Sequence, residues 1–237
     1  MSDGSYFRQF LAGRDSAADD EWARQMRNFA YAVGDREAGV ALLVDPAYRP
    51  GQLVELVGAD GLAIIGVLVT HYHPDHVGGD MMGRHLAGVA ELVADSGVAV
   101  HAQREEVPWL SHVTGLDAGA FTAHESGDVV SVGSVRVTLV HTPGHTPGSQ
   151  CLLVDGRLLS GDTLFLVGCG RTDLPGSDAV EMYHSLQERL AGVGDEVVLY
   201  PGHLYAPEAF APLGEVRATN PVLAPLPPER WLALFGP

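Results

Sequence analysis

The residues THYHPDHVGGD (Thr70–Asp80) follow directly after the apolar run LAIIGVLV (residues 62–69). This run is rich in β-branched residues and is too short for a buried helix, which predicts an interior strand. Histidines or aspartate then stand at four of the next seven positions, namely His71, His73, Asp75 and His76. So many ionisable side chains at the end of one strand indicate a functional site.

Three other apolar strands are each followed by a side chain of the same kind. His145 follows VRVTLV, Asp162 follows RLL, and His203 follows EVVL. In a layered α/β fold, the carboxyl ends of neighbouring strands lie along one edge of a sheet, where ligands bind. We therefore expect these four remote segments to meet at one site.

Five histidines and two aspartates at one site predict a metal centre. Neutral imidazole and carboxylate groups bind zinc, iron and manganese, and seven such groups exceed the number that one tetrahedral ion takes. We expect two divalent ions, with zinc as the first choice and iron or manganese as alternatives. The expected ligands are His71, His73 and His145 for one ion, Asp75, His76 and His203 for the other, and Asp162 as a bridge.

The other histidines have no such neighbours in the sequence. A single histidine is more often a hydrogen-bonded residue of the surface or core than a ligand. We expect that ordinary role for His85, His101, His112, His124 and His184. For His141, which lies four residues before His145, we expect a hydrogen bond to the groups that surround the ligands.

Strands and helices alternate along the chain, without a short repeat or a plausible linker, which predicts one α/β domain over residues 1–237. Ser177 is expected to cap a helix, with Glu181 at capping distance. Strands are expected at 28–33, 40–45, 64–70, 98–102, 135–141, 151–155, 157–162 and 196–203. Helices are expected at 51–61, 77–94, 177–190 and 229–235.

Composition narrows the classes of partner. The formal charge of −16 opposes binding to nucleic acid or to anionic membranes. No apolar run approaches the roughly 18 residues of a membrane span, and the first residues lack the layout of a signal peptide, so we expect a cytoplasmic protein.

Several common catalytic arrangements are absent from the sequence. Cys151 and Cys169 form no C-x-x-C motif, and the chain contains no lysine for a Schiff base. Ser160 lacks the G-x-S-x-G elbow of serine hydrolases.

Four sequence blocks resemble the metallo-β-lactamase fold superfamily and occur in that family's order. They are T-H-x-H-x-D-H-x-G-G (70–79), T-P-G-H-T-P-G-S (142–149), G-D-T (161–163) and P-G-H (201–203). The resemblance covers residues 28–220. It implies a four-layer αββα sandwich with metal ions at one edge of the sheets, an architecture that the order of strands and helices alone does not separate from a doubly wound sheet.

Within this superfamily, LSGDTLFLVGCGR (159–171) and GHLY (202–205) resemble glyoxalase II, the hydroxyacylglutathione hydrolases. The resemblance implies that a hydroxide between two ions attacks a thioester, with Asp75 and Asp162 as the catalytic carboxylates. Arg171 and Tyr205 would hold glutathione, although a surface ion pair and a packed aromatic ring are their alternative roles. Two positions depart from the family: Asp173 replaces an aromatic residue, and Ala224 stands where an arginine is expected. Both departures count against glutathione as the thiol carrier.

A second resemblance leads to a different reaction. GCGRTD (168–173) and YHSL (183–186) are similar to the persulfide dioxygenases, in which residues matching His71, His145 and Asp162 bind one iron. The P-G-H block differs from the P-A-H that is usual in that group. A lactonase or other ester hydrolase, a nuclease and a non-catalytic metal-binding module are further alternatives. In each enzymatic case except the nuclease we expect a small-molecule substrate, such as an acyl thioester, and a homodimer is possible.

Overall fold

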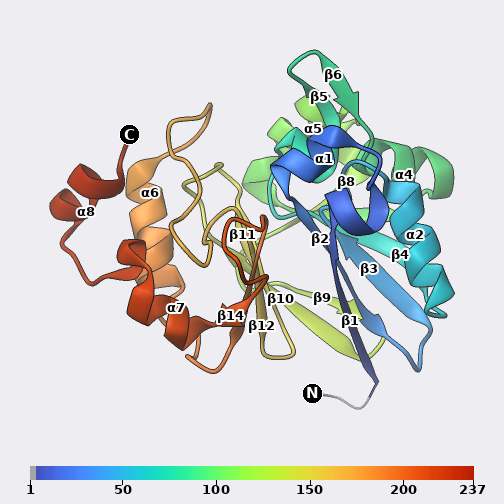
Figure 1. Cartoon of the computed structure of the whole chain (residues 1–237). Coiled ribbons are helices and arrows are strands. Elements are labelled where there is room, and N and C mark those ends of the chain that lie inside the picture. The colour runs from blue at the N-terminus through green and yellow to red at the C-terminus, as the bar shows by residue number, and fades with distance from the viewer. Residues whose placement is uncertain (1–3) are drawn as a thin grey trace.

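Two six-stranded β-sheets pack face to face at the centre of the molecule, and helices cover both outer sides (Figure 1). The structure is a computed structural model that describes residues 4–237, so residues 1–3 of the expected domain lie outside the described part. The layers follow the order helix, sheet, sheet, helix, which confirms the αββα sandwich. That the whole chain forms one domain stays a prediction.

The first sheet contains the N-terminal half of the chain in the order β1-β2-β3-β4-β7-β8. Its first three strands pair antiparallel, and the following strands pair parallel from β3 to β8. The strands are β1 (Ser5–Leu11), β2 (Phe29–Asp35), β3 (Val40–Val44), β4 (Ala63–Leu68), β7 (Ala99–Gln103) and β8 (Phe121–His124). The helices of this half are α1 (Glu21–Met26), α2 (Pro50–Ala59), α3 (Pro74–Val77), α4 (Val89–Ser96) and α5 (Val107–Thr114).

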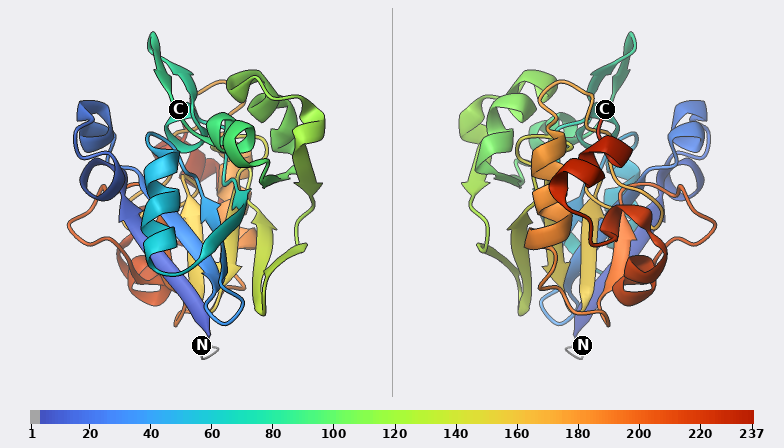
Figure 2. Two further views of the ribbon diagram at one scale, coloured as in Figure 1. Left: turned by 90° about the vertical axis from the view of Figure 1, so that its right-hand side faces the viewer. Right: turned by 90° about the vertical axis from the view of Figure 1, so that its left-hand side faces the viewer.

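The second sheet has the order β14-β13-β12-β11-β10-β9, and only β12 and β13 pair parallel. Its helices α6 and α8 cover the outer face opposite to α2 and α4 (Figure 2). The strands are β9 (Val129–Val132), β10 (Val135–His141), β11 (Gln150–Val154), β12 (Arg157–Gly161), β13 (Val198–Pro201) and β14 (Ala211–Pro212). The helices are α6 (Ala179–His184), α7 (Leu213–Thr219) and α8 (Pro228–Phe235).

Apolar side chains fill the space between the two sheets. Leu42 and Leu68 of the first sheet belong to the same buried cluster as Leu139, Leu152 and Leu159 of the second. The inner strands are hydrophobic on both faces because the opposite face of each sheet is covered by helices. Burial of these side chains supplies the main favourable free energy that holds the sheets together.

The packing brings four strand ends to one edge of the sandwich. Residues 70–76 follow β4, the loop with His145 follows β10, Asp162 follows β12 and His203 follows β13. Backbone bonds join the halves here, since Gln150 N donates to Thr70 O at 3.0 Å and Phe29 N donates to Gly202 O at 2.7 Å. The expected meeting of four remote segments is confirmed.

Three local predictions were wrong or incomplete. The helix expected over 77–94 is a short hairpin, β5 (Gly79–Met81) and β6 (Arg84–Leu86), followed by α4. Gly78 and Gly79 have φ values of +84° and +112°, which an L-residue in a helix does not adopt. Asp178, and not Ser177, caps the helix expected at 177–190, since its carboxylate accepts from Val180 N and Glu181 N. Residues 185–189 of this segment form a π-helix. Strand β1 precedes the first element that we expected.

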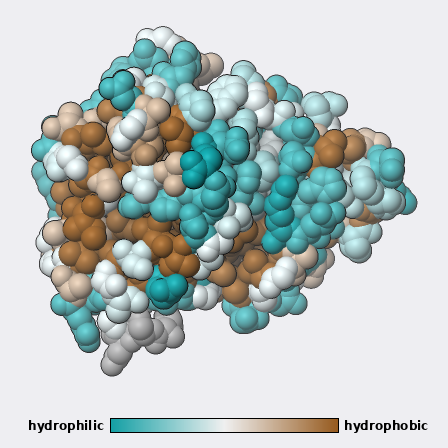
Figure 3. All heavy atoms as spheres, turned by 180° about the vertical axis from the view of Figure 1, so that it is seen from behind, coloured by the Kyte–Doolittle hydropathy of each residue, from teal (hydrophilic) through white to brown (hydrophobic). Residues whose placement is uncertain are grey.

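Seen from behind, the molecule carries its larger apolar areas over the N-terminal half (Figure 3). None of the helices within residues 4–237 is long and apolar enough to cross a membrane. The possible homodimer stays a prediction.

Trp231 is the buried side chain that anchors the C-terminal helix α8 to the core. Trp231 is fully buried, and its indole nitrogen donates to Val222 O at 2.8 Å. We expect Trp231→Ala to lower the free energy of unfolding by about 3–5 kcal/mol, because it leaves a large cavity. Leu234→Ala, on the exposed side of the same helix, should change it by less than about 0.5 kcal/mol. Urea unfolding of both variants measures the two changes in the free energy of unfolding. Equal changes would contradict the anchoring role of Trp231.

Candidate metal centre

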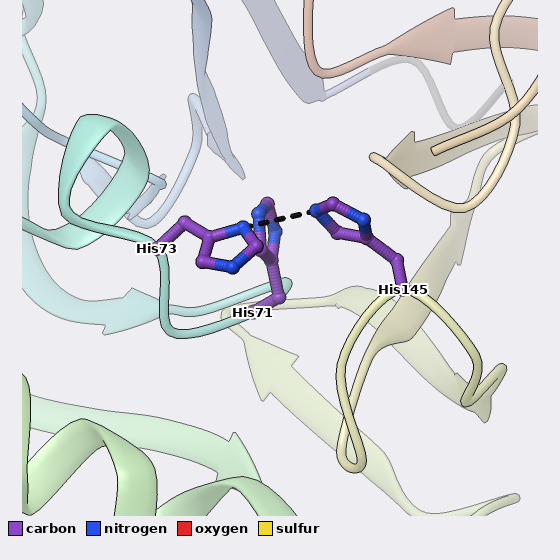
Figure 4. Close-up of side chains that lie close together, drawn as sticks. All are labelled: His71, His73 and His145. Carbon is purple, nitrogen blue, oxygen red and sulfur yellow. Dashed lines mark hydrogen bonds between the residues drawn. The ribbon is translucent and has the colours of Figure 1, made fainter. Parts of the chain in front are cut away.

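The first group of expected ligands consists of His71, His73 and His145. His71 and His73 lie on the loop after β4, and His145 points at them from the loop after β10 (Figure 4). His73 Nδ1 lies 2.9 Å from His145 Nε2, and the possible ligand atoms of the three rings are all within 4.8 Å of one another. The Nδ1–H of His145 donates to Arg171 O at 2.8 Å, which leaves its Nε2 lone pair to face the other two rings.

The second group consists of Asp75, His76 and His203. Nε2 of His76 lies 3.2 Å from Nε2 of His203, and Asp75 Oδ2 lies 3.7 Å and 3.5 Å from these two atoms. The ligand atoms around a tetrahedral ion with bonds of about 2.0–2.1 Å are about 3.3 Å apart. The spacing in this group is therefore that of three ligands on one face of such an ion.

Asp162 stands between the two groups. Its carboxylate oxygens lie 3.6 Å from His145 Nε2, 3.5 Å from His76 Nε2 and 3.3 Å from His203 Nε2. Asp162 Oδ1 and His71 Nε2 are both buried and have no hydrogen-bond partner among the described residues. Leaving a buried polar atom without a partner costs about 1–3 kcal/mol. A cation would satisfy both atoms, so the residues fit a metal ion.

The sequence analysis missed Asp45, which orients one ligand in each group. Asp45 Oδ2 accepts from the Thr70 hydroxyl and lies 3.1 Å from His76 Nδ1. Since the Thr70 hydroxyl donates to Asp45, it accepts from His71 Nδ1 at 3.0 Å. Both rings therefore turn Nε2 toward the centre, as is typical of metal-binding histidines. The sequence does contain the signal that located the ligands, because Asp45 directly follows the apolar strand VALLV.

Glu106, also missed, joins two of the ligand-bearing loops. Its buried carboxylate accepts from Tyr72 N at 2.6 Å, from the Thr146 hydroxyl at 2.7 Å and from Gly148 N at 2.7 Å. Tyr72 lies between two histidines of the first loop, and Thr146 follows His145. Burial raises the pKa of Glu106 to about 7 although these three donors oppose the shift. No local sequence pattern marks this residue.

The two groups differ in charge when no ion is bound. Burial lowers the pKa of His71 well below its usual value and lowers that of His73 to about 4, so both rings are neutral. Burial also opposes protonation of His76, but the carboxylates of Asp162 and Asp75 raise its pKa to about 10. The pKa of Asp162 is well below its usual range, because the charges of His203 and His76 outweigh its burial. His71 and His73 thus offer free lone pairs, whereas His76 holds a proton.

Residues 25–203 match the sequence model of the metallo-beta-lactamase superfamily. The chain belongs to this superfamily. It is 30% identical over 214 residues to the mitochondrial persulfide dioxygenase ETHE1 of Homo sapiens, which covers 88% of this chain and 76% of the relative. It is 36% identical over 182 residues to the hydroxyacylglutathione hydrolase of Maricaulis maris, covering 75% of this chain and 62% of that protein. The crystal structure of ETHE1 from Myxococcus xanthus matches with a TM-score of 0.77 and 26% identity, over 97% of this chain and 89% of that one.

These similarities identify a metalloenzyme of the metallo-beta-lactamase fold. Its relatives include both persulfide dioxygenases and hydroxyacylglutathione hydrolases, so the family alone does not set the reaction or the metal. The similarity to persulfide dioxygenases extends over a larger share of both chains. The hydrolase of Maricaulis maris has more than a third of its length outside the matched region.

Five of the seven candidate ligands line an open pocket of about 710 Å³, namely His73, Asp75, His145, Asp162 and His203. Its walls are largely apolar and consist of Met26, Met81, Met82, Phe165, Val167, Leu174 and neighbouring residues. Arg171 lines the pocket but forms an exposed ion pair with Asp173 at 2.8 Å, which was the alternative role for this residue. Tyr205 stacks on His203 with ring centroids 4.6 Å apart and is half exposed. Both residues line the pocket, and their contact with a substrate stays a prediction.

Histidines outside the two groups form ordinary polar contacts where the structure gives a partner. His85 lies between Asp80 and Glu91, and His101 pairs with His124 at 3.0 Å. His141 was expected to bond to the groups around the ligands, but its Nε2 lies 2.9 Å from Pro147 O and its backbone nitrogen bonds to Ser126.

The position of Asp45 leads to a test of ligand orientation. We expect Asp45→Asn to weaken metal binding by about 10- to 100-fold, because the amide cannot accept from His76 and Thr70 as the carboxylate does. Asp195→Asn removes an exposed carboxylate of the second half that pairs with Arg217 and serves as the control. Competition with a chromogenic chelator measures both affinities. Wild-type affinity in Asp45→Asn would contradict the role assigned to Asp45.

The raised pKa of Glu106 predicts a dependence of stability on pH. The folded protein holds this proton more tightly than the unfolded chain, whose carboxyl has the usual value of 4.5. The contribution of the Glu106 proton to the free energy of unfolding is therefore complete below about pH 4.5 and is lost as the pH rises through about 7. The free energy of unfolding of wild type minus that of Glu106→Gln should fall between pH 5 and about 8. A difference that stays constant with pH would contradict the raised pKa of Glu106 in the folded protein.

Proposed function

We propose that the protein is an iron-dependent dioxygenase that oxidises the terminal sulfur of a small persulfide. The observation that carries the proposal is the arrangement of His71, His145 and Asp162, in which two of the three side chains have buried, unpartnered ligand atoms. Two histidines and one carboxylate, with positions left open, are the ligand set of non-haem iron oxygenases. The similarity to human ETHE1 over 88% of the chain supports the same reading.

In this reaction His71, His145 and Asp162 would hold the iron, which supplies the binding and activation of molecular oxygen. The protein's own contribution is to fix these ligands and to place apolar walls beside them. Asp45 holds His71 through Thr70, and the carbonyl of Arg171 holds His145. The apolar walls of the pocket leave few partners for water beside the ligands. Positioning of the substrate sulfur at the ligand side of the pocket would follow from its packing against these walls.

The carrier of the persulfide sulfur is proposed to be less charged than glutathione. Arg171 is the only arginine that lines the described pocket, and Asp173 already neutralises it. Ala224 stands where glyoxalase II would offer a second cation. The walls instead present methionine, leucine, valine and phenylalanine side chains. A small thiol with an apolar body matches this surface better than a tripeptide with two carboxylates.

A second candidate is hydrolysis of a thioester, and the second ligand group favours it. Asp75, His76 and His203 are buried and spaced as ligands, so the chain has the residues for two ions that share Asp162. Two ions would lower the pKa of a water molecule toward about 7, and Asp75 would orient that water toward the thioester carbonyl. The similarity to hydroxyacylglutathione hydrolases supports this candidate over a shorter part of the relative.

One experiment separates the two candidates. Metal-free protein is loaded with iron(II) without oxygen or with zinc(II), the bound metal is counted, and each form is tested with glutathione persulfide, an alkyl persulfide and a panel of thioesters. We expect one iron per chain, uptake of oxygen with a persulfide, and faster turnover of the alkyl persulfide. Thioester cleavage without oxygen uptake by a protein holding two ions would replace this proposal with the hydrolase.

The ligand role of His71 has its own test. His71→Ala should lose oxygen uptake with persulfide and lower iron affinity by more than about 100-fold, since even loss of a group that orients a ligand costs 10- to 100-fold. His85→Ala, an exposed histidine of the β5–β6 hairpin, is the matched control. Circular dichroism confirms that both variants fold. Full activity and a normal iron content in His71→Ala would reject the site.

A further inference from the structure

One wall of the pocket is a tight turn of the chain at residues 165–168, shortly after Asp162, which we call the wall turn. The backbone nitrogen of Phe165 donates to Gly168 O at 3.1 Å and closes the turn. The side chains of Phe165 and Val167 both line the pocket. The wall turn therefore presents two apolar side chains to whatever the pocket holds.

Val167 lies at the mouth of the pocket and is exposed although it is apolar. Of the large apolar side chains within residues 4–237, those of Met82 and Val167 are the most exposed, at 88% and 67%, and both line this pocket. Phe165 is buried, and its ring centroid lies 6.1 Å from that of His203. The wall turn thus offers an apolar surface that extends from a candidate ligand to solvent, which suits the apolar body of a substrate.

The side chain of Asn220 fixes the wall turn from the C-terminal part of the chain. Its Oδ1 accepts from Gly168 N at 3.0 Å, and its Nδ2 donates to Phe165 O and to Gly168 O, both at 3.0 Å. Oδ1 also accepts from Val222 N at 3.3 Å, which joins the wall turn to the 3₁₀-helix Pro221–Leu223. Asn220 is buried and is not among the residues that line the described pocket.

An asparagine amide matches the groups that the wall turn presents. The turn offers one N–H group and two carbonyl oxygens to Asn220, and an amide supplies an acceptor and two donors in one side chain. A carboxylate of the same shape has no donor, and alanine has neither group. The irregular backbone of the wall turn is therefore held in place by one side chain at its two ends.

We propose that Asn220 is a positioning residue for substrate recognition, which presents Phe165 and Val167 to the apolar body of the substrate without touching it. A wall that is ordered before the substrate arrives costs less entropy on binding than a wall that must order around it. The C-terminal segment thereby sets which substrates are preferred. The inference rests on the proposed function, because that proposal supplies a substrate with an apolar body.

The first test compares the kinetics of two persulfides. With hexyl persulfide, iron-loaded Asn220→Ala should raise KM by about 10-fold and leave kcat within about twofold, because substrate binding is weakened while the reacting atoms are untouched. Methyl persulfide has almost no apolar body, so its KM should change by less than about twofold. Val167→Ser should give the same pattern, at about threefold for hexyl persulfide. The iron bound per chain should equal that of wild type in both variants.

Gln187→Ala is the matched control. The Gln187 amide donates to Val222 O at 2.9 Å and to Ala224 O at 3.1 Å, so it holds the same C-terminal segment, and neither bond reaches the wall turn. This variant should lower the free energy of unfolding, as Asn220→Ala does. It should leave both KM values unchanged.

Two more variants show through which atoms Asn220 acts. Asn220→Asp keeps an acceptor but has no donor for the carbonyl oxygens of the wall turn, so it should raise KM as Asn220→Ala does. Asn220→Ala combined with Val167→Ser should raise KM by less than the product of the two single effects, because both changes act on one surface.

Binding of an unreactive probe separates this inference from the proposed reaction. Zinc-loaded protein without oxygen is titrated with 1-butanethiol and with 2-mercaptoethanol, and calorimetry gives the dissociation constants. Asn220→Ala should weaken the binding of butanethiol by about 5- to 10-fold and that of mercaptoethanol by less than about twofold. This pattern in a protein that oxidises no persulfide would reject the proposed reaction and still support the role of Asn220.

Two results would overturn the proposal. One is an Asn220→Ala protein that binds both thiols as wild type does. The other is a Gln187→Ala protein whose affinity for butanethiol falls as much as that of Asn220→Ala, because the effect would then follow from loss of stability alone.

Discussion

The site depends on the burial of groups that need a positive charge between them. Seven imidazole and carboxylate side chains meet at one edge of the sandwich, and all of them except the partly exposed His73 are buried. Removing carboxylates and lone pairs from water without partners is unfavourable. Asp45 and Glu106 offset part of this cost by fixing the loops with hydrogen bonds, but His71 Nε2 and Asp162 Oδ1 have no hydrogen-bond partner among the described residues. A bound cation would interact favourably with both atoms.

The sequence is sufficient to locate the site because the ligands occur in local patterns. Each lies directly behind an apolar strand, and the strand ends of this fold share one edge. The four-layer sandwich itself came from the resemblance of the sequence blocks, since alternating strands and helices also fit a doubly wound sheet. The β5–β6 hairpin escaped prediction because its apolar residues have helical spacing, whereas the glycines at 78 and 79 require backbone angles that no helix allows.

Residues that orient the ligands are harder to find in the sequence. Glu106 acts through backbone and hydroxyl groups of distant loops, and nothing near it in the chain marks that role. Asn28, whose Nδ2 donates to Asp75 Oδ2 at 2.9 Å, lies at the start of a strand rather than at its end. A search for polar residues that follow apolar strands, which located the ligands, therefore does not identify it. Only the packing of β2 against the loop of His203 brings its amide to the second group.

The ligands come from both sheets, and this has a consequence for the cohesion of the molecule. His71, His73, Asp75 and His76 follow a strand of the N-terminal sheet, whereas His145, Asp162 and His203 follow strands of the C-terminal sheet. An ion at the shared edge is therefore a cross-link between two layers that otherwise adhere through apolar contact. Since the unfolded chain cannot offer this arrangement, the resistance of the protein to heat should follow the supply of free metal in its surroundings.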